Sequence, residues 1–428
     1  MTQICGRRYH HLVMGGMASE PEVRRFRAAR KRNFLSLNLA VLVAFYLLWG
    51  FGCGRDREAP ASVEFRNGIE IVHNAATPLH PNRSVAFEED LSIGPGDDSA
   101  AIRLYMPGSY AVDEKGFIYI SDDKDPGIKV FDPEGRPARM IGSKGEGPGE
   151  FQYVTSIAFL PDGRLLALDS KLNRISRFDP DGRFIGSHQW AILSMSREIY
   201  FVTDSFYVRE VTTVEPGKDP KTWPKTWRRR LRIAAFDFSG KEVLSFGDFE
   251  ARQSGFVTGR FSFKLPFSVY SILAGDRLNR RLYHCLNDRY LIQVFDEKGK
   301  VIREIDRPYE RRRVTLEDWK AYLDSFNTSA ENRTAIEKNA AKPDLKPVTP
   351  YMIVDDTGRL WVQLHESEKD GGRILTAFDV FDDRGHYDCR VLSAFIPGLF
   401  HKGKMYRFET DVETGERYLK RYRVIWSD

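Results

Sequence analysis

Side chains with distinctive reactivity are scarce in this sequence. Its 428 residues include only four cysteines and nine histidines. No Cys-x-x-Cys pair occurs, and neither His-x-x-x-His nor His-Glu-x-x-His is present, so nothing in the sequence supports a redox dithiol or a zinc site. A Gly-x-Ser-x-Gly nucleophile elbow is also missing. We therefore assign no catalytic residue, and we expect no cofactor unless a Ca²⁺ site, considered below, is occupied.

Net charge is small outside the N-terminus. The formal net charge is +5, but residues 1–33 alone hold eight basic side chains against two acidic ones. The rest of the chain therefore has a net charge of −1. A nearly neutral body lacks the positive field expected of a nucleic-acid-binding protein, so we expect no nucleic-acid partner. A hydrophobic content of 42% is sufficient for a large core.

One long apolar run is present, at residues 34–52 (FLSLNLAVLVAFYLLWGFG), and it follows the basic leader of residues 1–33. As a helix, these nineteen residues would span about 28 Å, close to the thickness of a bilayer core. Basic residues before such a run predict a cytoplasmic leader and an exported body. We predict a signal or transmembrane segment that places the protein in the cell envelope, attached to the membrane.

Cys53 follows this run directly. The stretch resembles a bacterial lipoprotein signal, and that resemblance implies cleavage and lipidation at Cys53. Gly50 and Phe51 depart from the pattern, because a leucine and a small residue are usual at those positions. An uncleaved membrane anchor is therefore the alternative. We expect residues 53–85 to be a linker and N-terminal extension.

A short phrase, Phe-Asp-x-x-Gly followed by Lys, Arg or His, recurs five times along the body. Proline in the second turn position and glycine in the last are typical of type I turns. Runs of β-branched and aromatic residues flank each copy, so each predicts four short antiparallel strands, the size of one propeller blade. The copies begin at Phe131, Phe178, Phe236, Phe295 and Phe381.

The glycine-rich stretch GSKGEGPGEF, residues 142–151, raises the question of a phosphate-binding loop. A dinucleotide fingerprint needs a helix after its glycines, because the helix N-terminus binds the pyrophosphate. Here a strand-like run follows instead, and Pro148 removes one backbone N–H from the loop. We therefore interpret the stretch as a connection between two blades.

Several of these segments are similar to one known group. VAFEEDLSIG, YAVDEKGFIYISD and IKVFDPEGRPARMIGSKGEGPGEF resemble the six-bladed β-propeller lipoproteins of bacteria, relatives of NHL-repeat propellers. The resemblance implies a fold and an envelope location, and it supplies no catalytic residues.

Counting strands leads to the same fold. Five blades fall within 106–396, and about three strands follow them. The spare strand at 86–95 would complete a sixth blade and close the ring. We therefore predict an all-β protein, a six-bladed β-propeller of four-stranded antiparallel blades over residues 86–428. A seven-bladed ring would need more strands than the sequence supplies.

Cys285 and Cys389 fall in different repeats, so we expect two separately buried thiols. The alternative is a disulfide bond between them, because the compartment of an exported protein is oxidising.

Two insertions interrupt the blades. Residues 315–342 predict a helical insertion capped by Thr315, which either packs over the rim or forms a lid over the central mouth. Residues 214–232 combine basic side chains with Trp223, Trp227 and Arg228. This combination suits anionic glycans or lipid headgroups, and the alternative is a solvated hairpin.

Acidic residues follow the second strand of several blades. The set Asp122, Asp169, Asp288 and Glu366 would supply the oxygen ligands that Ca²⁺ prefers, although aspartate is also a common turn former. We expect an envelope-anchored binding or interaction protein whose partner is a protein, a small molecule or a glycan. The alternatives are a Ca²⁺-dependent hydrolase or lyase of the lactonase kind at the central mouth, and glycan or membrane-surface binding through residues 214–232.

Overall fold

The computed structural model describes residues 61–94, 104–190, 194–195, 198–214, 226–227, 229–251, 254–257, 261–264, 267–325, 330–339 and 342–427. The predictions for the leader 1–33, the segment 34–52 and Cys53 lie outside these residues. Residues Ala59–Asp428 form one compact unit. Within the described residues, no helix is both long and apolar enough to cross a membrane.

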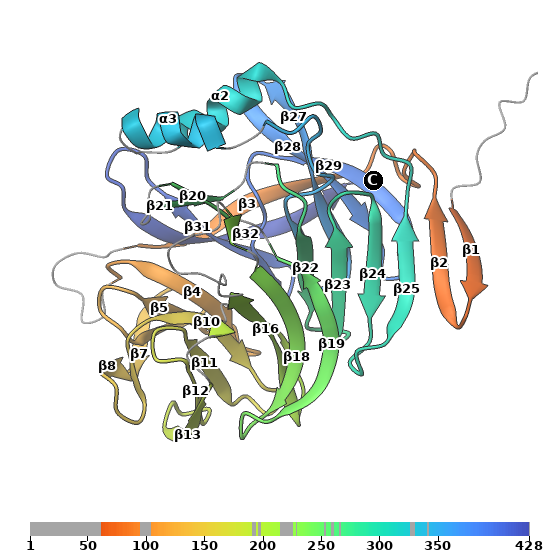
Figure 1. Ribbon diagram of the computed structural model, residues 1–428. Helices are drawn as coiled ribbons and strands as arrows, with labels where there is room; N and C mark the ends of the chain where they lie inside the picture. The colour runs from red at the N-terminus through yellow and green to blue at the C-terminus, as the bar shows by residue number, and fades with distance from the viewer. Residues whose placement is uncertain are drawn as a thin grey trace, which may run out of the picture. The chain divides into compact units, whose positions relative to one another are not determined.

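Six sheets surround a common centre (Figure 1), and the first five follow the chain from their innermost to their outermost strand. Blade 1 consists of β4 (Pro107–Val112), β5 (Ile118–Asp122), β6 (Ile128–Phe131) and β7 (Pro137–Ile141). Blade 2 consists of β10 (Val154–Phe159), β11 (Leu165–Asp169), β12 (Arg174–Phe178) and β13 (Phe184–Gln189). Blade 3 consists of β15 (Ile199–Val202), β16 (Phe206–Val214), β18 (Arg229–Asp237) and β19 (Glu242–Glu250), with β14 (Ser194–Met195) also paired to β16.

The second half of the ring repeats this order. Blade 4 consists of β22 (Ser271–Asp276), β23 (Arg281–Leu286), β24 (Leu291–Phe295) and β25 (Val301–Asp306). Blade 5 consists of β26 (Met352–Val354), β27 (Leu360–Asp370), β28 (Arg373–Phe381) and β29 (Tyr387–Ser393). Blade 6 consists of β30 (Leu399–His401), β31 (Lys404–Thr410), β32 (Arg417–Ser427) and β3 (Ser84–Ile93). The predicted six-bladed β-propeller is confirmed.

The two ends of the propeller pair with each other in blade 6. Strand β3 runs antiparallel to β32, from Ser84 opposite Ser427 to Ile93 opposite Leu419. Ion pairs reinforce the pairing, and they join Glu88 to Arg423, Glu89 to Lys420 and Asp90 to Arg421 at 2.6 to 2.9 Å. The strand expected within 86–95 therefore closes the ring, and it leaves β3 as the outermost strand of this blade.

The recurring phrase forms the turn between the third and fourth strands of blades 1 to 5. In blade 1, the carboxylate of Asp132 accepts the backbone N–H groups of Glu134 and Arg136. Gly135 then adopts φ of +83°, in the left-handed region that favours glycine. Phe131, one residue before this aspartate, is buried between blades. The phrase therefore encodes both a turn and a core residue.

The glycine-rich stretch connects blade 1 to blade 2. Its two ends, β8 (Ser143–Lys144) and β9 (Glu150–Phe151), form a short parallel pair. The guanidinium of Arg174 donates to the backbone carbonyls of Glu146 and Glu150 and holds the loop against blade 2. The next element along the chain is the strand β10, as we expected for a connection between blades.

The two cysteines of the body are buried and unpaired. Cys285 lies in β23 and Cys389 in β29, so each belongs to the core around a different sheet. Burial raises the pKa of each thiol to about 12. The prediction of two separate buried thiols is confirmed.

A hairpin was missed in the region that we expected to be a linker. Strands β1 (Ala61–Arg66) and β2 (Ile69–Asn74) pair antiparallel, and β2 adds in parallel to β25 at the outer edge of blade 4. The turn between them is Asn67–Gly68, both with positive φ, which is a strong hairpin signal in sequence. Blade 4 therefore belongs to a six-stranded sheet.

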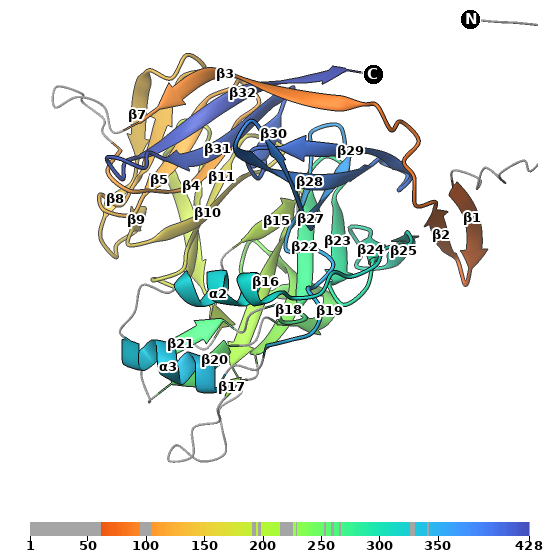
Figure 2. The same cartoon turned by 90° about the horizontal axis from the view of Figure 1, so that it is seen from above.

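The insertions carry the remaining elements. Helices α2 (Leu316–Asp324) and α3 (Ala330–Asn339) follow blade 4, and Thr315 caps α2 in a capping box with Asp318, as predicted. Strands β17 (Thr226–Trp227), β20 (Ser254–Val257) and β21 (Phe261–Lys264) form a small separate sheet. Helix α3 contacts β20, so segments from two different insertions meet (Figure 2).

Candidate functional site

One face of the ring carries all the long connections. It consists of the loops that precede each innermost strand and those that follow each second strand, and we call it the insertion face. In blade 1 these loops meet, because the N–H of Asp123 donates to the carbonyl of Met106. The connections from β16 to β18, from β19 to β22 and from β25 to β26 all begin and end at this face.

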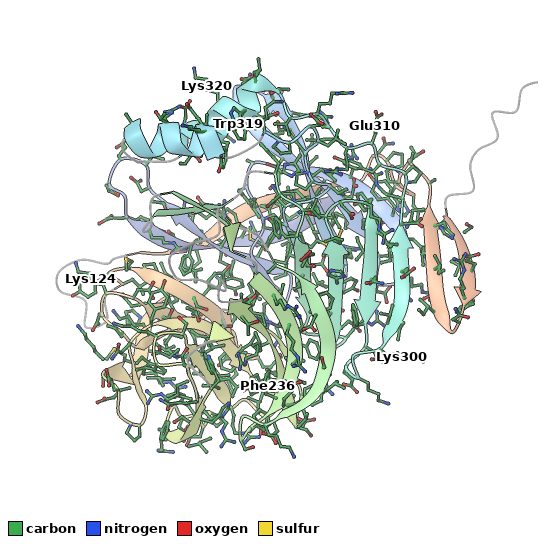
Figure 3. The ribbon with its side chains drawn as sticks, viewed as in Figure 1. Lys124, Phe236, Lys300, Glu310, Trp319 and Lys320 are labelled. Carbon is green, nitrogen blue, oxygen red and sulfur yellow. The ribbon has the colours of Figure 1, made fainter. Side chains whose placement is uncertain are left out.

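Blade 4 shows the two faces clearly (Figure 3). Glu310 and Trp319 lie toward the end of the blade where the helical insertion begins, and Lys300 lies in a turn at the opposite end. Helices α2 and α3 lie close to β20 and β21 in both ribbon views. Two of the insertions therefore build one layer on a single face.

The first predicted metal ligand, Asp122, is buried at the end of β5 and already has many partners. Its carboxylate accepts the backbone N–H groups of Tyr105, Met106, Lys124 and Asp125 at 2.6 to 3.2 Å. The ammonium of Lys129 donates to it at 3.0 Å. Burial alone would raise the pKa of Asp122, but these hydrogen bonds outweigh burial and keep the pKa below its usual value.

Asp169 repeats the arrangement at the end of β11 in blade 2. It accepts the backbone N–H groups of Gln152, Tyr153, Lys171 and Leu172 at 2.7 to 3.1 Å. In blade 4 the side-chain oxygen of Asn287 accepts the N–H of Tyr270 in the same way. These polar residues tie the loop before the innermost strand to the loop after the second strand. Their role in this geometry is structural.

The other two predicted ligands have different surroundings. Glu366 accepts a hydrogen bond from Arg390 at 3.0 Å and lies 3.5 Å from Arg312. Asp288 has a buried Oδ1 without a hydrogen-bond partner. In the part of the chain that the structure describes, no three His, Cys, Asp or Glu side chains gather in a way that could hold a metal ion. Ca²⁺ binding stays a prediction.

The predicted glycan-binding residues are mostly outside the described part of the chain. Trp223 and Arg228 lie outside it, and Trp227 is described only as backbone in β17. The final residues of the predicted insertion, from Arg229 onward, belong to β18 of blade 3. Glycan binding through residues 214–232 stays a prediction.

Sequence reasoning missed a group of side chains around the centre of the ring. The innermost strands of a propeller surround its central channel. Glu198 directly precedes β15, Arg277 directly follows β22, and Tyr351 directly precedes β26. Tyr200 lies in β15 and Tyr110 in β4. No motif links these five positions in sequence, since they come from four different blades.

Each of these five side chains affects the pKa of at least one other member of the group. Burial raises the pKa of Glu198, and the charge of Arg277 opposes that rise. Burial lowers the pKa of Arg277, which Glu198 and Tyr110 oppose. Burial also raises the pKa of Tyr200 and Tyr351, and the charge of Glu198 adds to both shifts.

Glu198 and Arg277 are nevertheless exposed to solvent. Glu198 precedes the innermost strand β15 and lies toward the insertion face, whereas Arg277 follows the innermost strand β22 and lies toward the opposite face. Among the described residues, neither side chain makes a hydrogen bond or an ion pair, with the other or with a third group.

A rim of apolar side chains surrounds the mouth at the insertion face. Each member comes shortly before an innermost strand, and each is 38% to 51% exposed: Met106, Tyr153, Val269 and Ile396. Exposed apolar side chains are ordinary when scattered, but a ring of them at one mouth is typical of a contact surface.

One acidic residue at this mouth titrates in an unusual range. Burial, followed by the charge of Asp122, raises the pKa of Asp123 to about 6. Its Oδ1 is buried without a hydrogen-bond partner. His365, at the mouth in blade 5, also has a buried ring nitrogen without a partner, and burial lowers its pKa to about 4.

The comparisons with known proteins concern the fold. A family model described as 6-bladed beta-propeller matches residues 111–208. No curated protein matches the chain. A solved structure of an exported protein from Bacteroides fragilis shares 11% identity and a TM-score of 0.47, over 83% of this chain and 99% of that one.

Two further solved structures are similar at the same level. A member of the DUF4221 family from Bacteroides vulgatus shares 12% identity and a TM-score of 0.46, over 80% of this chain and 99% of that one. Virginiamycin B lyase from Staphylococcus aureus shares 11% sequence identity and a TM-score of 0.38, over 80% of this chain and 100% of that one. Values this low carry no argument about function. The chain is a six-bladed β-propeller with a match to a propeller family over residues 111–208, and lipidation and a relationship to NHL repeats stay predictions.

Proposed function

We propose that the protein is a ligand-binding propeller of the bacterial cell envelope, which takes its ligand at the mouth of the central channel on the insertion face. The basic leader and the apolar run at 34–52 motivate the location. The observation that carries the binding role is the rim of apolar side chains at this mouth, Met106, Tyr153, Val269 and Ile396, each of which is 38% to 51% exposed.

Apolar side chains that face water gain free energy when a partner covers them, by about 25 cal/mol for each Å² of apolar surface removed from water. The four rim residues precede the innermost strands of blades 1, 2, 4 and 6. A ligand that covers all four would therefore lie across the mouth of the channel, which is why we assign the rim to binding.

A hydrolase or lyase at the same mouth is the second candidate, and Asp123 is the observation that favours it. A carboxyl group with a pKa of about 6 can exchange a proton near neutral pH, as a general acid or base must. The Oδ1 atom of Asp123 is buried, and no nucleophilic side chain forms a hydrogen bond with it among the described residues. A metal-dependent enzyme would also need a group of metal ligands, and the described residues do not bring three such side chains together. We therefore place binding first.

Site-specific photocrosslinking in the native envelope would test the proposed face. A photoreactive amino acid would replace Tyr153 or Ile396 on the rim of the full-length protein. The control position is Leu278, which is more exposed than either rim residue, at 63% against 42% and 45%, and lies in a turn of blade 4 on the opposite face. We expect adducts, of a small molecule or of a partner, at the rim positions only. Equal labelling at Leu278, or labelling there alone, would contradict the proposal.

A further inference from the structure

We infer that the insertion face docks on the lipid surface of the membrane to which the predicted N-terminal segment attaches the chain, and that apolar side chains at the tips of its connections enter that surface. This inference rests on the proposed function, because it names a lipid surface as the partner that covers the rim. Three observations support it: the end of the propeller at which the chain enters, the positions of the exposed apolar side chains, and the mixed charges beside them.

The chain enters the propeller at the insertion face. Strand β25 ends at this face with Asp306, and β2 runs parallel to β25 with His73 opposite Asp306. The ring nitrogen Nδ1 of His73 lies 2.9 Å from the carboxylate of Asp306, which supports this register. Strand β1 runs in the opposite direction, with Ala61 opposite Asn74. Ala61 therefore lies at the insertion-face end of the six-stranded sheet (Figure 1).

The connection from the predicted membrane segment to β1 is short. Cys53 is the first residue after the apolar run, and Ala61 follows it by eight residues. A chain of this length reaches at most about 28 Å when it is fully extended. The other end of the six-residue strand β1 lies about 20 Å farther along the sheet. Attachment at Cys53, by lipidation or by an uncleaved segment, therefore favours the insertion face as the side that meets the lipid.

Exposed apolar side chains gather on the same face. Besides the rim, three lie at the ends of its connections, and we call them the apolar tips: Leu316 at the start of α2, Ile374 near the turn between β27 and β28, and Val412 in the turn after β31. They are 79%, 63% and 98% exposed. In the turns of the opposite face, Leu278 is the one apolar side chain of comparable exposure among the described residues. This asymmetry is typical of a face that meets a partner.

The form of this surface favours lipid over a protein partner. The apolar tips belong to three separate connections, and polar residues interrupt them, as Asp411 and Glu413 do on either side of Val412. A protein interface is usually built around a contiguous apolar core. Side chains at separate tips can instead enter a fluid layer of lipid one by one, as the apolar side chains of proteins that lie on a membrane do.

Attraction between charges is not the basis of this contact. Exposed charges of both signs lie beside the apolar tips, since Arg313 comes three residues before Leu316 and Asp411 directly precedes Val412. A surface of mixed sign gains little from anionic headgroups. The short connection to the membrane compensates, because it holds the face at a local concentration of about millimolar, at which weak insertion is sufficient. We therefore expect docking on neutral and on anionic lipid alike.

Photocrosslinking of the full-length protein in vesicles would test this inference. The vesicles contain phosphatidylcholine, alone or mixed with phosphatidylglycerol, and mass spectrometry identifies lipid adducts. A photoreactive amino acid replaces Leu316, Val412 or the rim residue Ile396, and Leu278 is the control position. We expect lipid adducts at the three insertion-face positions in both kinds of vesicle and few at Leu278. Equal yields at Leu278, or adducts that require phosphatidylglycerol, would overturn the inference.

A triple variant tests the role of the apolar tips. Leu316→Ser, Ile374→Ser and Val412→Ser together should lower the yield of lipid adducts at Ile396 by about 5-fold or more, because the apolar surface that enters the lipid is lost. Leu278→Ser makes the same kind of change on the opposite face and should leave the yield unchanged. Melting temperatures establish that both variants fold.

An unchanged yield in the triple variant would overturn the inference. The proposed function has a separate outcome, because it depends on adducts at the rim in the native envelope. If lipid adducts fail in vesicles while the rim still forms adducts with a small molecule or a protein in the envelope, the lipid partner is wrong and the proposed function stands.

Discussion

The carboxylate of Asp122 lies 3.0 Å from the ammonium of Lys129, and both side chains are removed from solvent inside blade 1. The same carboxylate accepts four backbone N–H groups from two loops. Asp122 is therefore the point at which the loop before the innermost strand is fastened to the loop after the second strand. This geometry explains why an aspartate stands there without any need for a metal.

Replacing Asp122 should destabilise the propeller strongly. Asp122→Ala removes the acceptor of four backbone N–H groups and the buried partner of Lys129, which also pairs with the exposed carboxylate of Asp125 at 3.0 Å. The loss of one partner of a buried pair costs about 3 to 5 kcal/mol. Lys129→Met should cost less, since Asp122 keeps its amide donors. The midpoint of urea unfolding measures both. Asp162→Ala, at an exposed turn, is the control and should change little; an equal loss in all three variants would contradict this role.

Two glycine-to-alanine substitutions should distinguish the free-energy cost of a steric clash from the cost of backbone strain. Gly142 has φ of +69°, and a Cβ there would press on the carbonyl oxygen of Gly149 and lie 2.5 Å from the ring of Phe151. Gly163 has φ of +83°, but its Cβ would meet nothing closer than 3.7 Å. We expect Gly163→Ala to cost about 1 kcal/mol for backbone strain alone and Gly142→Ala to cost several times more.

Thermal unfolding of the two glycine variants provides the comparison. A similar loss of melting temperature in both would show that the loop rearranges to admit the side chain. In that case the packing of Gly142 against Phe151 would not be a constraint on the fold.

The fold could be predicted because its signals are local and repeated. Each copy of the Phe-Asp-x-x-Gly phrase encodes a turn, a buried aromatic residue and the spacing between two strands. The hairpin at 61–74 lies outside the repeat, and the only signal for it in the sequence is its turn, Asn67–Gly68, so it was not predicted.

The candidate site could not be predicted in the same way. Met106, Tyr153, Val269 and Ile396 are single residues before the inner strands of four different blades, and only the closed ring brings them to one mouth. In contrast, the residues that looked like metal ligands share a position within the repeat. The structure explains that shared position by backbone hydrogen bonds in blades 1 and 2.

Ring closure depends on aromatic packing as well as on strand pairing. Phe87 in β3 packs against Phe395 and Trp361, with ring centroids 5.2 and 6.3 Å away. Phe87→Ala should lower the free energy of unfolding by about 2 kcal/mol, since it opens a partly buried cavity at the seam. Phe65→Ala removes the same group from a position that is 76% exposed and should change stability by less than about 0.5 kcal/mol. Urea unfolding distinguishes them, and equal effects would contradict a stabilising seam.

Removal of divalent metal ions should leave the thermal stability of the propeller unchanged. The carboxylates of Asp122 and Asp169 are already satisfied by backbone N–H groups, so they lack the free lone pairs that a Ca²⁺ ion of six to eight ligands requires. We expect EDTA and added Ca²⁺ to leave the melting temperature where it is. A rise with Ca²⁺ that EDTA reverses would instead support the metal-dependent enzyme.

The pH dependence of stability should reveal Asp123. Its pKa is raised to about 6 in the folded protein from an ordinary value of 3.8, so the folded state binds this proton more tightly than the unfolded state does. Stability from this group is therefore fully present below about pH 4 and is lost as the pH rises through about 6. The loss is smaller than about 1.4 kcal/mol per pH unit, because water reaches part of this side chain and screens its interactions.

Substitution of Asp123 by asparagine isolates this contribution. Asp123→Asn cannot ionise and should lose less stability between pH 4 and pH 6 than the parent. Urea unfolding at pH 4, 5, 6 and 7 measures the difference, with Asp162→Asn as the exposed control. Parallel curves for Asp123→Asn and the parent would show that Asp123 titrates normally, and they would remove the observation that favours acid–base chemistry at this mouth.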